Sequence, residues 1–240
     1  MNRAYMKKHT WFQLEAHPEV YYGQYIVPNF ISNSVAIKTS ENHWVFISPG
    51  EKMLNNLPDE FNNKDAKLSI IFPNSFHYMG VNAWLEQFPD TKLYASKKAK
   101  KRLEGKGFKS ILMLEHEQPE FPKNYEVLIP PGHRGGDVWI TKQGSDNDSL
   151  WITCDSFLNY ERVSKQPVAR TLQSLLGAAP GLKISQVIKW ILLDRKATFK
   201  TWVLNQLQKD KPTILIPSHG EVENDPKLAK KLRVLIESRL

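Results

Sequence analysis

Short apolar segments that stop at proline or glycine recur along this chain, and they limit the folds that it can adopt. Four of them are HWVFIS before Pro49, KLSIIF before Pro73, YEVLI before Pro130 and TILI before Pro217. Such runs of apolar and β-branched residues, ended by a residue that breaks regular structure, are typical of buried β-strands. The sequence therefore predicts sheets whose strands open into tight loops.

Helical patterns lie between and after these strands. We expect helices over residues 52–61, 81–88, 97–104, 169–176, 185–193 and 197–209, and a last helix after Asp225. The apolar residues of the last helix recur at helical spacing, namely Leu228, Leu232, Leu235 and Ile236. Because strands and helices alternate without a long linker, we expect one continuous α/β domain over residues 1–240.

The composition is that of a folded protein. Of the 240 residues, 41% are hydrophobic and 11% aromatic, which is enough for a substantial core and argues against disorder. The single cysteine, Cys154, excludes an intramolecular disulfide and a cysteine-rich zinc module, and it fits a reducing compartment.

No export or membrane segment is expected. Residues 1–10 lack the apolar stretch of a secretory signal. The most apolar long stretch, residues 172–193, contains one proline and two lysines, so we expect no transmembrane span. We therefore expect a cytoplasmic protein.

Three of the seven histidines stand just after predicted core strands. His77 follows LSIIF, His133 follows EVLIPPG and His219 follows TILIPS, while Asp155 ends the strand LWITC. Rigidly held loops at strand ends are common places for binding groups. Imidazole and carboxylate are the ligands that divalent transition metals prefer. The four residues thus predict a metal site assembled from distant loops; the alternative is that they are loop residues with unrelated partners.

Some neighbours of these residues have no predicted role. Cys154 precedes Asp155 and is expected to face the core as a small apolar residue, because neighbours in a strand point to opposite faces. Asp137 and Tyr78 lie near candidate ligands in sequence, but the sequence assigns neither of them a function.

The order of these segments resembles the metallo-β-lactamase-like hydrolase superfamily. PPGHRGGDVWI is similar to that family's Pro-Gly-His-Thr-x-Gly segment, LWITCDSF to its strand ending in Gly-Asp, and ILIPSHGEV to its closing Gly-His-Gly segment. The hairpin NSVAIKT…HWVFISPG resembles the first strands, with Ser48-Pro49-Gly50 in place of an Asp-x-Gly turn. The resemblance covers roughly residues 30–221 and implies a four-layer αββα sandwich.

One segment departs from the family pattern. The hallmark His-x-His-x-Asp-His is expected at Pro73–Gly80, where this chain reads PNSFHYMG. Only His77 offers a nitrogen ligand there, and the hallmark's Asp corresponds to Tyr78 or Met79. The chain therefore resembles a divergent branch, classed only as a domain of unknown function, with a degenerate motif.

The resemblance implies His77, His133, Asp155 and His219 as the metal ligands. Four ligands fit one metal ion rather than two, so we expect one ion or none. Zinc is the expected ion, with iron or manganese as alternatives. Loss of the hallmark's Asp removes the obvious general base.

Three functions remain open from the sequence. The first is a metal-dependent hydrolase of an unknown small-molecule substrate. The second is a protein that keeps the fold and has lost catalysis, with a binding role. The third, a relative that processes nucleic acid, rests on the net charge of +8 and the basic helix at 97–104. No aromatic residue interleaves with that helix, so we expect a small-molecule partner rather than nucleic acid.

Residues 157–195 are predicted to form a helical insert, where the family places segments that cover the active site. Its many apolar residues suit outer-layer packing, a dimer surface or a lipophilic cap over the substrate. The sequence does not choose among these roles, and it leaves the oligomeric state open.

Overall fold

The computed structural model describes residues 8–27, 30–61, 66–144, 148–163 and 167–240. The contacts divide the chain into two compact units, Met1–Pro122 and Lys123–Leu240, and each is described by itself. The single domain expected from the sequence remains a prediction.

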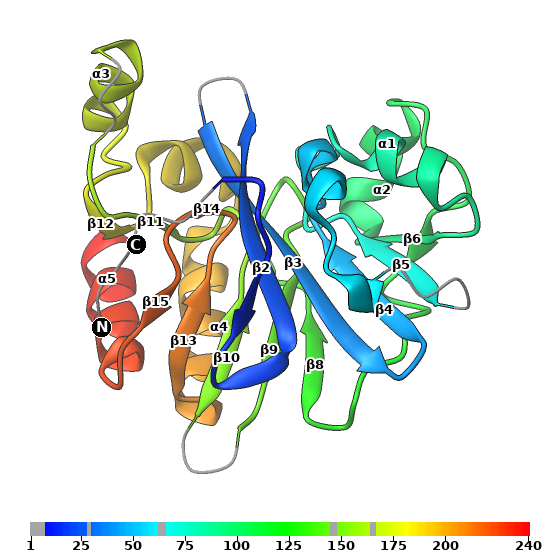
Figure 1. The fold of residues 1–240 in the computed structure, drawn as a ribbon. Coiled ribbons are helices and arrows are strands. Elements are labelled where there is room, and N and C mark those ends of the chain that lie inside the picture. The colour runs from blue at the N-terminus through cyan, green and yellow to red at the C-terminus, as the bar shows by residue number, and fades with distance from the viewer. Residues whose placement is uncertain (1–7, 28–29, 62–65, 145–147, 164–166) are drawn as a thin grey trace. The chain divides into compact units, whose positions relative to one another are not determined.

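The first unit is built on a seven-stranded sheet in the order β1-β2-β3-β4-β5-β6-β7 (Figure 1). Neighbours from β1 to β4 are antiparallel, and those from β4 to β7 are parallel. The strands are β1 (Phe12–Leu14), β2 (His17–Val27), β3 (Phe30–Ser40), β4 (His43–Ile47), β5 (Lys67–Ile71), β6 (Lys92–Ala95) and β7 (Leu112–Met113).

Helices cover one face of this sheet. They are the 3-10 helices η1 (Glu51–Asn56) and η2 (Asp59–Phe61) and the α-helices α1 (Val81–Gln87) and α2 (Lys97–Glu104). Aromatic rings dominate the core between helices and strands: Trp11, Trp44, Phe46, Phe61, Phe72, Trp84 and Phe108. The helix expected over 52–61 is two short 3-10 helices. Leu57 between them is extended because it precedes Pro58, whose ring disfavours helical backbone in the preceding residue.

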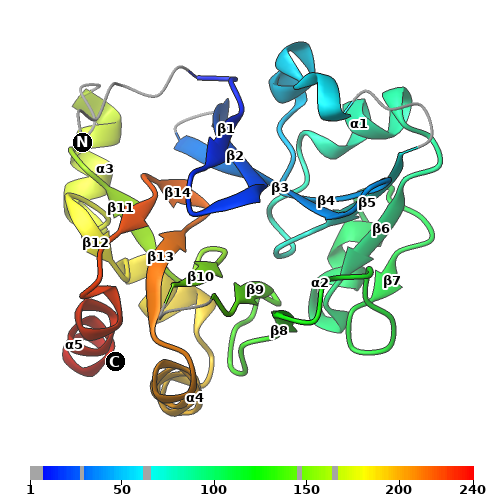
Figure 2. The same ribbon diagram turned by 60° about the horizontal axis from the view of Figure 1, so that its bottom comes forward.

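The second unit holds a five-stranded sheet, β15-β13-β10-β9-β8, and a three-stranded sheet, β12-β11-β14 (Figure 2). The strands are β8 (Tyr125–Leu128), β9 (Trp139–Lys142), β10 (Ser149–Ile152), β11 (Leu158–Tyr160), β12 (Gly181–Lys183), β13 (Pro212–Ile216), β14 (His219–Gly220) and β15 (Glu223–Asn224). Its helices are α3 (Pro167–Leu175), the π-helix η3 (Ile188–Leu192), α4 (Lys196–Lys209) and α5 (Leu228–Arg239). The insert expected at 157–195 thus contains β11, α3, β12 and η3.

Helices α4 and α5 pack on the five-stranded sheet. Leu228, Leu232 and Ile236 of α5 are fully buried, as their four-residue spacing predicts. They join a core that includes side chains from β9, β10, β13 and α4: Trp139, Trp151, Leu215, Phe199, Val203 and Leu207. Within the described residues, no helix is both long enough and apolar enough to cross a bilayer.

Candidate metal centre

Asp155 and His219 come together at the ends of two parallel strands of the second unit. β10 and β13 pair in parallel up to Ile152 and Ile216, and each candidate ligand stands three residues beyond its strand. Backbone hydrogen bonds continue this pairing into the loops, from Thr153 N to Ile216 O at 3.0 Å. The result is a distance of 3.2 Å between His219 Nε2 and Asp155 Oδ1.

The backbone at His219 is held by its neighbours. His219 pairs with Leu158 of β11, and the next residue, Gly220, has φ +96°. A Cβ on Gly220 would lie 2.0 Å from Asn159 O, so only glycine fits this position. The close approach of β11 to β14 therefore fixes the direction in which His219 leaves the sheet.

A glycine in the left-handed backbone conformation also positions His133. Gly132 before it has φ +78°, and a Cβ there would lie 2.7 Å from Arg195 O. Arg134 N donates to Leu192 O at 2.7 Å, and His133 forms an isolated bridge with Leu193. The loop that carries His133 is thus hydrogen-bonded to the last residue of η3 and paired with the residue that follows it.

Asp137, to which the sequence assigned no role, contacts His133. His133 Nδ1 and Asp137 Oδ1 are 3.2 Å apart, and both side chains are fully buried. The second carboxylate oxygen, Oδ2, accepts a 2.7 Å hydrogen bond from Ser156 Oγ, which in turn accepts one from Trp139 Nε1 at 3.1 Å. The sequence signal that could have indicated Asp137 is a carboxylate four residues after a histidine in a glycine-rich loop.

Asp137, Cys154 and Asp155 form one buried cluster. Each offers a potential metal-ligand atom, and the three atoms lie within 4.8 Å of one another. Cys154 is fully buried, as expected. Its surroundings are not purely apolar, however, because Asp137 and Asp155 lie in the same cluster, so Cys154 and Asp155 do not point to opposite faces as expected. Burial raises the pKa of the Cys154 thiol well above its usual range, and the charges of Asp155 and Asp137 act in the same direction.

The negative charge of Asp155 also affects Tyr160, at the end of β11. Burial raises the pKa of its phenol, and the carboxylate of Asp155 raises it further. Tyr160 therefore stays protonated near neutral pH and keeps a hydrogen that it can donate.

His77 belongs to the first unit, where it follows β5. β4 and β5 are parallel and pair Ile47 with Ile71, so Ser48 and His77 lie just beyond the same edge of the sheet. Ser48 Oγ hydrogen-bonds to His77 Nδ1 at 2.9 Å and to the Tyr25 hydroxyl at 2.9 Å. With Nδ1 engaged by Ser48, Nε2 is the nitrogen of His77 suited to bind a ligand.

His43 gives a useful contrast in the first unit. Its Nδ1 lies 2.8 Å from Thr39 Oγ1 and its Nε2 lies 3.0 Å from Ser69 Oγ. Both ring nitrogens are therefore engaged by hydroxyl groups, and this histidine is structural.

The structure thus joins some of the predicted residues directly. Asp155 contacts His219, and His133 reaches the same cluster through Asp137. His77 has its own hydrogen-bonded setting in the first unit. The donor set of the second unit, imidazoles and carboxylates, is one that suits zinc, iron or manganese.

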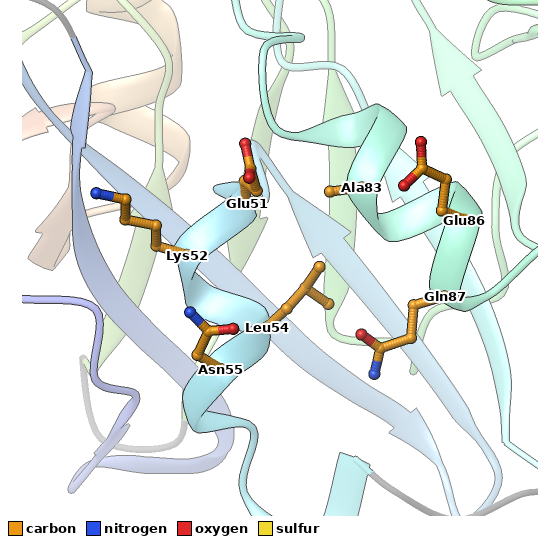
Figure 3. Close-up of a pocket in the computed structure, with 7 residues that line it drawn as sticks. All are labelled: Glu51, Lys52, Leu54, Asn55, Ala83, Glu86 and Gln87. Carbon is orange, nitrogen blue, oxygen red and sulfur yellow. The ribbon is translucent and has the colours of Figure 1, made fainter.

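A surface pocket in the first unit lies apart from these residues. It has a volume of about 430 Å³ and is open, with η1 on one side and α1 on the other (Figure 3). Its lining is mostly exposed and includes Glu51, Lys52, Asn55, Glu86 and Gln87. None of the predicted ligands lines it, so the pocket does not bear on the candidate metal centre.

Comparison with known proteins identifies the fold. No family model and no curated protein matches the sequence. Among solved structures, the DIM-1 metallo-β-lactamase matches with a TM-score of 0.63 and 14% identity, covering 98% of this chain and 99% of that one. A metallo-β-lactamase from Hirschia baltica matches with a TM-score of 0.59 and 14% identity, covering 94% and 96%.

A second group of matches consists of flavo di-iron proteins. A mutant flavo di-iron protein from Thermotoga maritima matches with a TM-score of 0.63 and 16% identity over 95% of this chain. The chain spans 61% of that protein's length. At 14% to 16% identity these matches show the fold and not the activity. The chain therefore has the metallo-β-lactamase fold, the α/β sandwich that its sequence resembles.

Proposed function

We propose that this chain is a metal-dependent hydrolase of a small-molecule substrate, with a reduced site that holds one cation. The proposed ligands are His133, Asp155 and His219 of the second unit and His77 of the first. His77 is included on the resemblance of its segment alone. The observation that carries the proposal is the 3.2 Å distance between His219 Nε2 and the buried Asp155 Oδ1.

That distance fits two ligands of one ion. Ligand atoms bound at 2.0–2.2 Å to a tetrahedral zinc are about 3.3–3.6 Å apart. The charges fit as well, since Asp137 and Asp155 are buried side by side. Two buried carboxylates are stabilised when a positive charge lies close to them.

Each residue has a separate task in this proposal. When bound, the cation supplies a Lewis acid that lowers the pKa of water and polarises a carbonyl or phosphoryl oxygen. Asp155 supplies negative charge and His219 a neutral nitrogen. The protonated Tyr160 is suited to donate a hydrogen bond to a substrate oxygen. Catalysis without the hallmark's Asp is expected to be slow, because no carboxylate stands between Pro73 and Gly80.

The absence of a carboxylate between Pro73 and Gly80 favours a second candidate, a protein that binds metal and ligand without catalysis. Tyr78 or Met79 occupies the place of the hallmark's Asp, and neither can act as a carboxylate base. This candidate predicts a full complement of metal with no chelator-sensitive turnover.

Nucleic acid is not our proposed substrate. No aromatic residue lies within the basic helix α2, although the rings of Phe76 and Tyr78 lie beside cations of this region. Arg102 sits 4.6 Å from the Phe76 ring centre and Lys106 lies 5.5 Å from that of Tyr78. The protein's own cations thus already occupy these rings, which weakens the case for base stacking.

The test is a metal measurement combined with substrate screening. Protein purified without chelator is expected to carry about one equivalent of zinc, iron or manganese per chain. Ester, lactone and phosphodiester substrates are then tested with and without chelator. His219→Ala and Asp155→Asn are expected to weaken metal binding by more than about 100-fold, beyond what changes outside the ligand shell cost.

Two control variants make the result specific. His116 is an exposed histidine of the first unit. Asp210 is a buried carboxylate of the second unit. His116→Ala and Asp210→Asn are expected to keep the metal. The proposal fails if wild-type protein holds less than about a tenth of an equivalent even after incubation with zinc, iron and manganese salts.

A further inference from the structure

Asp137 lies in the loop of a proposed ligand, yet it is not among the proposed ligands. Its side chain is fully buried, and its Oδ1 lies 3.2 Å from His133 Nδ1. A buried carboxylate is costly unless it is paired or hydrogen-bonded. The burial of this carboxylate beside an equally buried imidazole therefore indicates a structural or functional role for Asp137.

The hydrogen bonds beyond Asp137 have a fixed direction. An indole N–H can only donate, so Trp139 Nε1 donates to Ser156 Oγ at 3.1 Å. The single hydroxyl hydrogen of Ser156 is then directed to Asp137 Oδ2, 2.7 Å away. Asp137 consequently accepts at Oδ2, and its Oδ1 faces His133 Nδ1 at 3.2 Å, at ion-pair distance but without the alignment of a formed hydrogen bond.

We propose that Asp137 is a positioning residue that holds His133 in the tautomer with its proton on Nδ1. Ser156 and Trp139 fix the orientation of the carboxylate, and the lone pair of His133 is left on Nε2 for the cation. This inference rests on the proposed function, since it concerns a ligand of the same site. Outer-shell carboxylates of this kind orient a ligand imidazole and increase its basicity.

The second unit contains a matched control for this arrangement. Asp210 is also a buried carboxylate that accepts from a serine and a tryptophan, through Ser149 Oγ and, at 2.6 Å, Trp151 Nε1. Unlike Asp137, it has no ion pair with a histidine among the described residues. Asp137→Asn and Asp210→Asn therefore carry similar structural costs, and only the first touches a proposed ligand.

Two measurements test the proposal. In protein stripped with chelator, long-range ¹H–¹⁵N NMR of the imidazoles reports which nitrogen of His133 carries the proton. We expect Nδ1–H in wild type and in Asp210→Asn, and loss of this preference in Asp137→Asn. Zinc affinity, measured by competition with a chromophoric chelator, is expected to fall about 10- to 100-fold in Asp137→Asn and to stay unchanged in Asp210→Asn.

The outcomes separate this proposal from the function on which it rests. If wild type binds zinc and Asp137→Asn binds it equally well, the positioning role is wrong and the metal site stands. If wild type binds no metal, both are wrong. An Nε2–H tautomer of His133 in wild type also overturns the positioning role. Should Asp137→Asn not fold, Ser156→Ala removes the donor to Oδ2, together with the acceptor of Trp139 Nε1, and is expected to show the same changes to a smaller degree.

Discussion

His219 Nε2 and Asp155 Oδ1 lie 3.2 Å apart although β11, α3, β12, η3, α4 and β13 separate the two residues in sequence. Their contact follows from the parallel pairing of β10 with β13, because carboxyl ends of parallel strands meet at one edge of a sheet. Asp155 and His219 extend by the same number of residues beyond that edge. A site built in this way keeps its geometry only if the loop backbones are fixed.

A substitution at Gly220 tests whether the backbone next to His219 must be fixed. Gly220→Ala is expected to lower the free energy of unfolding by more than about 2 kcal/mol, because the left-handed backbone disfavours a side chain and Asn159 O lies 2.0 Å from the new Cβ. Gly107 has the same φ of +96°, but no described atom would lie within 4 Å of its Cβ. Urea unfolding of Gly107→Ala should therefore show a loss of only about 1 kcal/mol. Equal losses in the two variants would show that the approach of β11 does not matter.

Ser48 is the residue through which the first unit orients His77. Ser48→Ala removes the hydroxyl that hydrogen-bonds to His77 Nδ1, and we expect a loss of about 1–2 kcal/mol in unfolding free energy because that buried nitrogen loses this hydrogen bond. If His77 is a ligand, zinc affinity should fall by about 10-fold or more as well. Tyr25→Phe is the control, since it removes the hydrogen bond between the Tyr25 and Ser48 hydroxyls and leaves the one from Ser48 to His77. Equal zinc affinities in the two variants would argue against His77 as a ligand.

Much of the fold could be predicted from the sequence because apolar runs and breakers are local signals. The segments expected at 43–48, 67–72 and 92–95 are strands β4, β5 and β6, within one residue at their ends. The short strands β11, β14 and β15 could not be predicted, because two or three residues show no periodicity. Their pairing arises from the tertiary fold.

The candidate site divides in a similar way. His133, Asp155 and His219 could be selected because each follows a recognisable strand. The roles of Asp137 and Ser48 depend on contacts with Ser156 and with His77, which are distant in sequence. Only a folded structure brings such partners together, so residue type and spacing alone do not identify them.

His43 gives the chain a stability that depends on pH. Burial lowers the pKa of His43, with Lys67 and Lys92 acting in the same direction and Glu120 against it. A lowered pKa means that the unfolded chain takes up the proton first, so stability is full above the unfolded value of about 6.5 and falls as the pH drops through the folded value. Urea unfolding at pH 7.5 and pH 5 should show a larger loss in wild type than in His43→Gln, which cannot titrate. An equal loss in both proteins would assign the acid sensitivity to other groups.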